Sequence, residues 1–160
     1  RAATLSQRDG VLGLPLIRNV KTVDPTDPSS PQVVQIESAM GAAIEVFEGA
    51  QALEVDRSRF LPVKSTNDLL VLRSDVYEVG ADGVVRTLAE PPLVSLDPRY
   101  FKTIADFEAR IPVAPSLRDA HSFTVEGDWS LGSDVAITGD VRLDDEGSAQ
   151  RVPDGARLLG

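Results

Sequence analysis

The 160-residue chain contains no cysteine and a single histidine, His121. Without thiols it can form no disulfide framework, no cysteine nucleophile and no zinc–thiolate site, and one imidazole is too few for a multi-histidine metal site. No apolar run approaches the roughly 20 residues that a membrane helix needs, and no signal-peptide pattern opens the chain. These absences favour a cytoplasmic protein that does not act at a membrane.

Basic residues are also scarce. The chain has 16 Lys and Arg against 25 Asp and Glu, which gives a formal net charge of −9. Nucleic acids and anionic membranes bind to basic surfaces, so we expect neither as a partner. A few cations can still form a local phosphate site. With 42% hydrophobic and 26% charged residues, the chain otherwise has the composition of an ordinary globular protein.

Residues 1–31 predict a helix end, a short strand and then a loop. Residues 1–14 hold scattered apolar positions and a turn signal, which favour a helix end running into a loop. Residues 14–17 predict a buried strand that delivers Lys21 at its carboxyl end. Three prolines within residues 24–31 exclude a helix or a central strand, so this stretch is predicted to be a loop.

A helix is predicted after this loop. Ser30 is a suitable N-cap, and Pro31 is a suitable first helical residue. From Gln32 the apolar positions fall on one helical stripe, made of Ile36, Met40, Ala43, Ile44 and Phe47. Gly49 supplies a stop. We expect this stripe to pack into the core and Glu37, at its edge, to be structural.

The middle of the chain predicts short elements separated by breaks. Residues 55–64 lack helical spacing and contain a proline, so they are predicted to be irregular. Polar capping residues then precede a short helix over residues 69–77. Asp82-Gly83 predicts the turn of a hairpin, and a further helix is expected over residues 100–110. Prolines after that helix mark the predicted domain boundary at residue 115.

The sequence beyond this boundary follows a six-residue period. Two apolar columns recur at that interval, one formed by Val125, Leu131, Ile137 and Leu143, the other by Phe123, Trp129, Val135 and Val141. A third column is acidic: Asp128, Asp134 and Asp140. This spacing is typical of a parallel β-helix, in which each hexapeptide forms a short strand and a turn. We interpret the aspartates as turn formers rather than calcium ligands. A β-meander with coincidental spacing is the alternative.

Two earlier segments resemble a known family. One is RSRFLPVK (57–64) running into TNDLL (66–70), which resembles the lysine motif of eukaryotic-type UTP–glucose-1-phosphate uridylyltransferases. The other is NVKTVD (19–24) followed by QIESAMGAAI (35–44), which resembles the preceding segment of that family. The family ends in a short left-handed β-helix, where the six-residue columns fall here. Its Gly-rich nucleotide-binding loop has no counterpart in this sequence.

The resemblance implies the C-terminal portion of a larger enzyme. The fold class expected is an α/β fragment, the end of a nucleotidyltransferase catalytic domain over residues 1–115, followed by a short left-handed parallel β-helix tail over residues 116–160. The implied substrates are UTP and glucose 1-phosphate, with glucose favoured over N-acetylglucosamine by residues 57–64. Mg²⁺ would accompany UTP, with its ligands outside this chain. The chain alone is expected to be inactive.

The resemblance also implies a mechanism and its residues. The phosphate oxygen of glucose 1-phosphate attacks the α-phosphorus of UTP, and pyrophosphate leaves. Negative charge gathers in the transition state, which cations stabilise. Lys64 occupies the lysine of the family motif and is the predicted catalytic residue. Lys21 is the predicted phosphate ligand, with Asn19 as a sugar or phosphate contact. Arg59, and with a weaker case Arg57, either adds to this pocket or pairs with local carboxylates.

Two other functions stay open. A short β-helix has open ends, and exposed strand edges can pair with another copy, so the chain could be a non-catalytic module that forms a homo-oligomer. The tail domain of the resembled family is associated with oligomer formation. A hexapeptide-repeat acyltransferase is the other possibility. Such enzymes need more coils and a histidine at a trimer interface, whereas His121 lies before the hexads.

Overall fold

The chain forms two compact units in a computed structural model that describes residues 13–56 and 59–160. The first unit is Arg1–Phe60 and the second is Leu61–Gly160. The helix end expected within the first twelve residues falls outside the described part. No helix in the described part of the chain has the length and apolar character that crossing a membrane requires.

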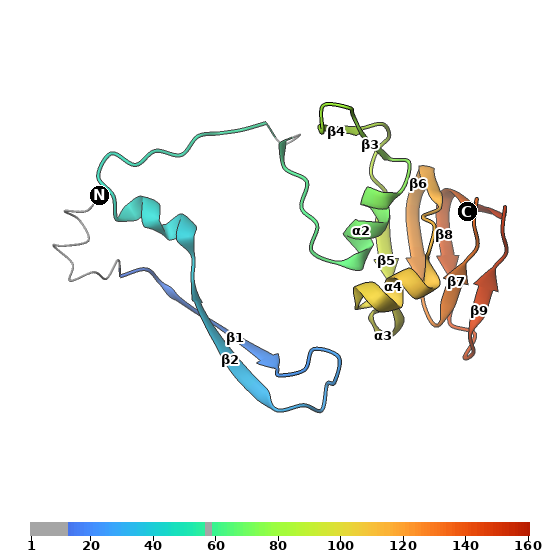
Figure 1. Ribbon diagram of the computed structural model, residues 1–160, viewed down its shortest axis with the longest axis horizontal. Helices are drawn as coiled ribbons and strands as arrows, with labels where there is room; N and C mark the ends of the chain where they lie inside the picture. Colours follow the sequence, from blue (N-terminus) through green and yellow to red (C-terminus); the bar gives the residue numbers. More distant parts are fainter. Residues whose placement is uncertain (1–12, 57–58) are drawn as a thin grey trace. The chain divides into compact units, whose positions relative to one another are not determined.

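The described part of the first unit is a β-hairpin followed by a short 3-10 helix. Strand β1 (Leu16–Thr22) pairs antiparallel with β2 (Gln32–Ser38) along its whole length. The connection over residues 24–31 contains turns and no helix or strand, which confirms the predicted loop. The 3-10 helix η1 (Met40–Glu45) follows the hairpin, as Figure 1 shows.

The long helix predicted from Gln32 is wrong. Residues 32–38 are a strand, so Ser30 and Pro31 do not begin a helix. The reason is local as well as tertiary. The β-branched residues Val33, Val34 and Ile36 fit a pleated strand better than a helix, and β1 supplies the partner that a strand needs. Within residues 32–49, all of which the structure describes, helical backbone appears only at η1.

The apolar residues of the hairpin and of η1 are exposed. In β1, Leu16 is 64% exposed and Val20 is 63% exposed. In the expected helical stripe, Ile36 is 62% exposed and Met40 is 74% exposed. The predictions of a buried strand and a core-facing stripe are therefore wrong for this structure, because a hairpin of two strands provides no second layer to cover its faces. Lys21 is the last residue but one of β1, so it lies at the carboxyl end of the strand, as expected.

The second unit begins with a helix and a hairpin, both predicted. Helix α2 (Thr66–Arg73) starts three residues earlier than expected, because its capping group is Ser65. Strands β3 (Tyr77–Val79) and β4 (Val85–Thr87) pair antiparallel. Gly83 lies in the turn between them at φ 75°, a left-handed conformation that glycine adopts without steric cost.

A strand and two short helices follow. The sequence does not predict β5 (Leu93–Leu96). Two helices, α3 (Pro98–Phe101) and α4 (Ile104–Arg110), stand where one helix is expected over residues 100–110. The break arises at Thr103, whose side chain accepts a hydrogen bond from a main-chain N–H of α4 and so begins a new helix.

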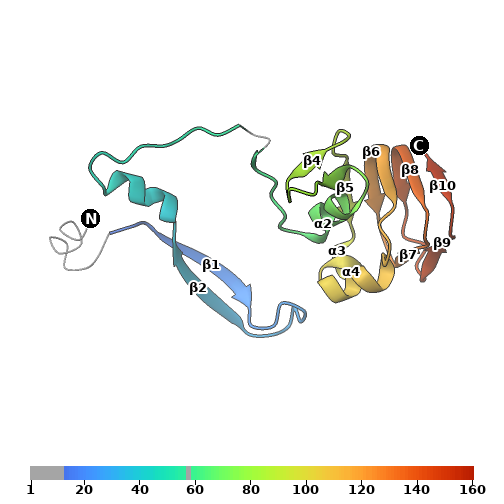
Figure 2. The ribbon, with the colours of Figure 1, turned by 45° about the horizontal axis from the view of Figure 1, so that its top comes forward.

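Parallel strands make up the rest of the second unit. They are β6 (Ser116–Val125), β7 (Trp129–Leu131), β8 (Ala136–Leu143), β9 (Gln150–Val152) and β10 (Arg157–Leu159). One sheet has the order β10-β8-β6-β5, and every pair in it is parallel. Strands β7 and β9 form a second parallel pair. Figure 2 shows β6, β8 and β10 lying in sequence across the sheet.

The spacing between paired strands follows the hexads. Ser122 of β6 lies opposite Asp140 of β8, and the two are 18 residues apart, a distance of three hexads. The sequence separation is larger further along the chain, where the N–H of Ser133 bonds to Asp154, which is 21 residues away. The additional residues fall at 144–148, between β8 and β9.

The core of the second unit combines the apolar columns with residues of the helices. Six of the eight column residues are buried: Phe123, Val125, Leu131, Val135, Ile137 and Val141. Trp129 and Leu143 are partly buried and pack against them. The prediction that both columns point inward is thus confirmed. Pro115, at the predicted boundary, is itself fully buried within the second unit. The division into residues 1–115 and 116–160 stays a prediction.

We expect Phe123→Ala to destabilise the second unit strongly. The side chain is fully buried, and removing a buried phenyl ring loses its transfer free energy and leaves a cavity, at a cost of about 3–5 kcal/mol. Urea denaturation followed by the fluorescence of the single tryptophan, Trp129, measures the change. Leu159→Ala in the exposed edge strand β10 is the control, with an effect of about 0.5 kcal/mol or less. Equal losses for the two variants would contradict this core.

Candidate functional site

Lys64 stands directly before Ser65, the capping residue of α2. Its side chain is exposed. Among the described residues, only its main-chain N–H forms a hydrogen bond, to the Oδ2 atom of Asp68 at 2.9 Å. The ammonium group is therefore available to a ligand. The structure places the predicted catalytic lysine on the second unit, at the start of a helix.

The start of α2 is held by a single carboxylate oxygen. Oδ2 of Asp68 accepts the N–H of Lys64, the N–H of Ser65 and the hydroxyl of Ser65, each at 2.9 Å. These hydrogen bonds, the one from the Lys64 N–H foremost, hold the pKa of Asp68 below its usual value. The carboxylate is thus ionised at neutral pH and bonds most strongly as the anion.

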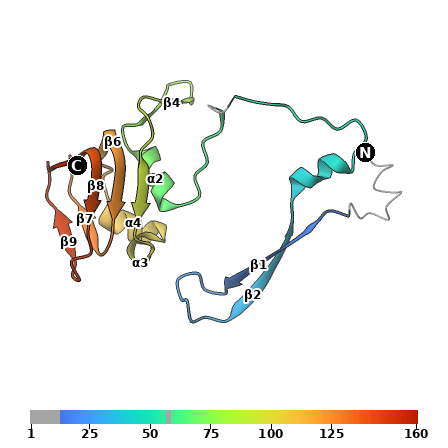
Figure 3. The same ribbon diagram turned by 180° about the vertical axis from the view of Figure 1, so that it is seen from behind.

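The next two residues fasten α2 to its neighbours. The buried side chain of Thr66 donates a hydrogen bond to the carbonyl of Phe101 in α3, with an O–O distance of 2.6 Å. The side-chain oxygen of Asn67 accepts the N–H of Leu96 in β5 at 3.0 Å. Figure 3 shows α2 lying beside β5. The first turn of the helix is therefore a fixed support for the residue before it.

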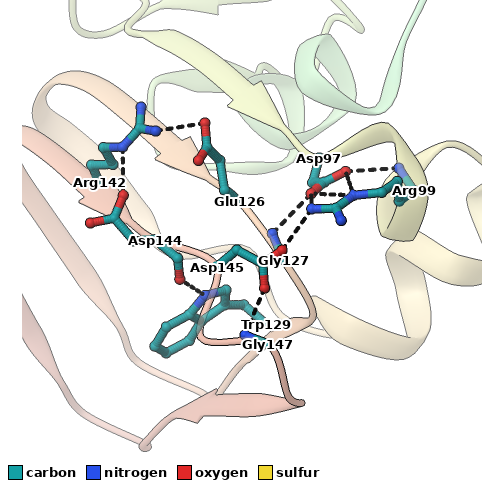
Figure 4. Close-up of polar contacts among 9 residues, drawn as sticks. All are labelled: Asp97, Arg99, Glu126, Gly127, Trp129, Arg142, Asp144, Asp145 and Gly147. Carbon is teal, nitrogen blue, oxygen red and sulfur yellow. Dashed lines mark hydrogen bonds and ion pairs between the residues drawn. The ribbon is translucent and has the colours of Figure 1, made fainter.

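A cluster of charges fixes α3 and β5 in turn (Figure 4). Asp97, whose side chain is 7% exposed, lies between these elements and accepts several hydrogen bonds from Arg99. It also accepts the N–H of Gly127, which precedes β7, at 2.9 Å. Arg99 pairs further with Asp145, at 2.8 Å. The bonds from Arg99, above all others, hold the pKa of Asp97 well below its usual range, although burial opposes them.

The loop between β8 and β9 belongs to the same network. Arg142 forms ion pairs with Glu126 at 2.6 Å and with Asp144 at 2.7 Å. The indole N–H of Trp129 donates to the carbonyl of Asp144. Figure 4 shows Arg142, near the end of β8, between Glu126 and Asp144, and the Trp129 indole against the main chain at Asp144. This cluster holds the second unit together and contains no free cation for a phosphate.

Asn19 and Lys21 lie on one face of β1, because they are two residues apart in a strand. The side-chain amide of Asn19 donates to Glu37 of β2 at 2.5 Å, and Gln35 donates to the same carboxylate at 3.4 Å. The prediction that Asn19 lies beside Lys21 is compatible with this arrangement. Sequence reasoning took Glu37 as a structural residue of a helix and missed Gln35, because a helical interpretation of β2 hides the contacts that both residues make in the hairpin.

Arg59 is exposed and lies in the first unit, where its N–H bonds to the carbonyl of Asp56. Arg57 falls outside the described residues. The structure therefore brings Asn19 and Lys21 together on one strand, and places Arg59 in the same unit as they are. Lys64 belongs to the other unit.

The acidic column of the hexads has structural partners. Asp128 pairs with Arg110 at 2.7 Å, and Asp140 accepts the hydroxyl of Ser122 at 2.7 Å. Asp134 has a φ of 54°, in the left-handed region that suits a tight turn. In residues 13–56 and 59–160, no three side chains of His, Cys, Asp or Glu gather as metal ligands could. The described residues thus do not fit a resident Mg²⁺ site.

Comparison with known proteins identifies one family. The family model described as UTP–glucose-1-phosphate uridylyltransferase matches residues 3–138. The protein of this name from Hordeum vulgare is 41% identical over 152 residues, which are 92% of this chain and 31% of the relative. That of Solanum tuberosum is 39% identical over 91% of this chain and 30% of the relative. The chain spans less than a third of the length of these relatives.

Solved structures give the same result. A mutant UDP-glucose pyrophosphorylase from Leishmania major, in complex with UDP-glucose, superposes with a TM-score of 0.82 at 42% identity. The match covers 99% of this chain and 34% of the Leishmania chain. A UDP-glucose phosphorylase from Trypanosoma brucei has a TM-score of 0.84 at 37% identity, with 99% and 36% covered. The mixed α/β fold therefore matches part of these structures.

We expect the ionised Asp97 to make folding depend on pH. Its pKa is lowered by folding, so its stabilising contribution is fully present above its unfolded pKa of about 3.9 and is lost as the pH falls through the lower folded value. Asp97→Asn should lower the free energy of unfolding at pH 7 by about 1–3 kcal/mol. It should also flatten the fall of stability below about pH 4. Denaturant titrations at several pH values test this.

The control for this experiment is Asp119→Asn, which changes an exposed carboxylate on β6. It should leave both the stability at pH 7 and the slope below pH 4 close to those of the unmodified chain. An Asp97 variant with the unmodified pH profile would show that the carboxylate does not stabilise the fold as an anion.

Proposed function

The chain belongs to the UTP–glucose-1-phosphate uridylyltransferase family, and we propose that it supplies the C-terminal portion of an enzyme that forms UDP-glucose and pyrophosphate. The family match over residues 3–138 carries this proposal. Because the chain spans 31% of the Hordeum relative, the activity is assigned to a longer enzyme, and the chain alone is proposed to be inactive. Glucose is the proposed sugar, since the Leishmania relative is complexed with UDP-glucose.

Lys64 is the proposed catalytic residue. An oxygen of the glucose 1-phosphate phosphate forms a bond to the α-phosphorus of UTP, while the bond from that phosphorus to the bridging oxygen breaks and the electron pair leaves with pyrophosphate. Charge grows on the phosphate oxygens during this exchange. An exposed ammonium group on a fixed helix start can lie against those oxygens and stabilise the charge without rearranging.

Lys21, Asn19 and Arg59 are the proposed substrate-binding residues. Lys21 offers a cation to phosphate, and Asn19 offers an amide to phosphate or sugar. In the structure Glu37 accepts a hydrogen bond from the Asn19 amide, which orients that side chain on the face it shares with Lys21. Arg59 supplies a second exposed cation in the same unit.

Mg²⁺ is proposed to arrive with UTP, whose phosphate oxygens bind it, because the described residues provide no cluster of metal ligands. The metal supplies charge neutralisation on the nucleotide when bound. The residues of this chain are assigned only the binding of phosphate and sugar, and the stabilisation of charge by Lys64.

The proposed architecture has two parts, the end of a catalytic domain over residues 1–115 and a left-handed parallel β-helix tail over residues 116–160. Three observations support the tail. The strands are paired in parallel, residues 122–125 of β6 pair with residues 18 further along the chain, and most residues of the apolar columns are buried. A repeat of three hexads per layer is the spacing that a three-sided coil requires.

Substitution of Lys64 tests the catalytic proposal. We would replace the matched 34% of the Leishmania major enzyme with this chain and measure UDP-glucose formation by the chimera. Lys64→Ala should lower turnover by about 10²–10³-fold, as expected for losing one charge-stabilising group. Lys64→Arg should recover only part of the loss, because a planar guanidinium does not occupy the position of an ammonium.

Lys102→Ala provides a matched control, since it removes another exposed lysine of the second unit. It should leave turnover within about twofold. The 160-residue chain assayed by itself should form no UDP-glucose. Normal turnover of the Lys64→Ala chimera would remove Lys64 from the mechanism.

A second function, a module that forms homo-oligomers, is favoured by the edge of the parallel sheet. Strand β10 has β8 as its one neighbour in the described sheet, and Leu159 on β10 is 78% exposed. An edge strand with an exposed apolar side chain can pair with the same edge of another copy.

Light scattering after size exclusion tests this second function. If copies pair through β10, the unmodified chain has a mass above 17.1 kDa, and Leu159→Asp brings it to that value by placing charge at the interface. Leu93→Asp changes an equally exposed leucine on β5, at the other end of the sheet, and should leave the oligomer intact. A monomeric unmodified chain would exclude the proposal.

A further inference from the structure

We propose that Asp68 is a positioning residue for Lys64, holding the main chain of the lysine so that its ammonium group projects from one fixed place. The inference rests on the catalytic role proposed for Lys64 and goes beyond it. It assigns a function in the reaction to a carboxylate that makes no contact with substrate.

The hydrogen bonds of Asp68 reach beyond those of a helix cap. In a capping box, the carboxylate at the third helical position bonds to the N–H of the capping residue, which is Ser65 here. The same Oδ2 atom also accepts the N–H of Lys64, one residue outside the helix, at an equal 2.9 Å. This additional bond is not needed to satisfy the helix, and it acts on the residue that carries the ammonium group.

Lys64 ends a segment with little other support. Residues 61–64 form neither helix nor strand, and Pro62 has no N–H to donate. Within the described residues, the N–H of Lys64 is the one main-chain group of this segment with a hydrogen-bond partner. Without Asp68, the backbone at Lys64 would keep its covalent link to α2 but lose the bond that fixes its direction.

Asp68 itself lies in a helical turn that is fixed to the elements around it. Its neighbours Thr66 and Asn67 bond to the main chain of α3 and β5, and Leu70, in the next turn, is fully buried in the core. A side chain that is fixed at its base and bonded at its tip can transmit this rigidity to Lys64. Displacement of a catalytic group by about 1 Å can lower turnover by about 10²-fold.

The simplest alternative is that Asp68 only stabilises α2. The second unit contains a matched residue for comparison. Asp106 has the corresponding position in α4, and its carboxylate accepts the hydroxyl of the capping residue Thr103 at 2.6 Å. Asp106 has no hydrogen bond to Lys64. Removing it should therefore reproduce the loss of a helix-capping carboxylate without the loss of the lysine's support.

A double-mutant cycle in the Leishmania chimera separates the two roles. Asp68→Ala should lower kcat by about 10-fold or more, with a smaller change in KM, while Asp106→Ala leaves kcat within about twofold. In the Lys64→Ala background, Asp68→Ala should cause no further loss of kcat. An equal loss in both backgrounds, or an equal loss from Asp106→Ala, would overturn the positioning role. Normal turnover of Lys64→Ala would instead overturn the proposed function, and the positioning role with it.

Amide hydrogen exchange on the 160-residue chain tests the bond directly, and requires no activity. The Lys64 N–H should exchange slowly in the unmodified chain and at least 10-fold faster in Asp68→Ala. Ser65→Ala removes the hydroxyl that donates to the Asp68 carboxylate and accepts the Asp68 N–H, but it leaves the bond from the Lys64 N–H, so Lys64 should stay protected in that variant. Fast exchange of Lys64 in the unmodified chain, or unchanged exchange in Asp68→Ala, would overturn the proposal.

Discussion

The carboxylate of Asp97 joins three parts of the second unit that are distant in the sequence. It caps α3, follows directly after β5, and accepts the N–H of Gly127 before β7. Leu96, the residue before it, is bonded to Asn67 at the start of α2. A buried anion with this many donors is costly to leave unpaired, so the elements that supply the donors are constrained together. The place of Lys64 at the start of α2 depends on this chain of contacts.

The basic residues of the second unit have two different roles, since some pair with carboxylates and one is proposed to bind phosphate. Arg99 and Arg142 are committed to carboxylates and give the turns of the parallel strands their shape. Lys64 forms its hydrogen bond to Asp68 through the main chain, and its exposed ammonium group interacts with that carboxylate through charge alone. An acidic chain can in this way hold a cation for a phosphate, because most arginines of the described residues already pair with carboxylates. Net charge alone says little about such a site.

Local patterns allowed part of the structure to be predicted. The hexad columns, the hairpin turn at Gly83 and the short helix α2 each depend on neighbouring residues, and the structure confirms them. The stripe that includes Ile36 has a helical period, but residues 32–38 form a strand because their β-branched side chains favour one and β1 supplies the partner. The lysine of the site could be found through a family motif. Its hydrogen bond to Asp68 could not, since a capping signal does not reveal that the same oxygen also holds the preceding residue.

The extra residues between β8 and β9 show where the parallel strands accept a change of length. They lengthen the connection between these two strands, where the main-chain N–H of Gly147 donates a hydrogen bond to the side chain of Asp145. After this connection, Val152 is buried again and Leu158 lies opposite Ile137. The six-residue period therefore resumes in register after residues 144–148, and the later side chains still alternate between pointing inward and outward. A change of length in this connection therefore leaves the strand pairing and the buried side chains on either side of it in place.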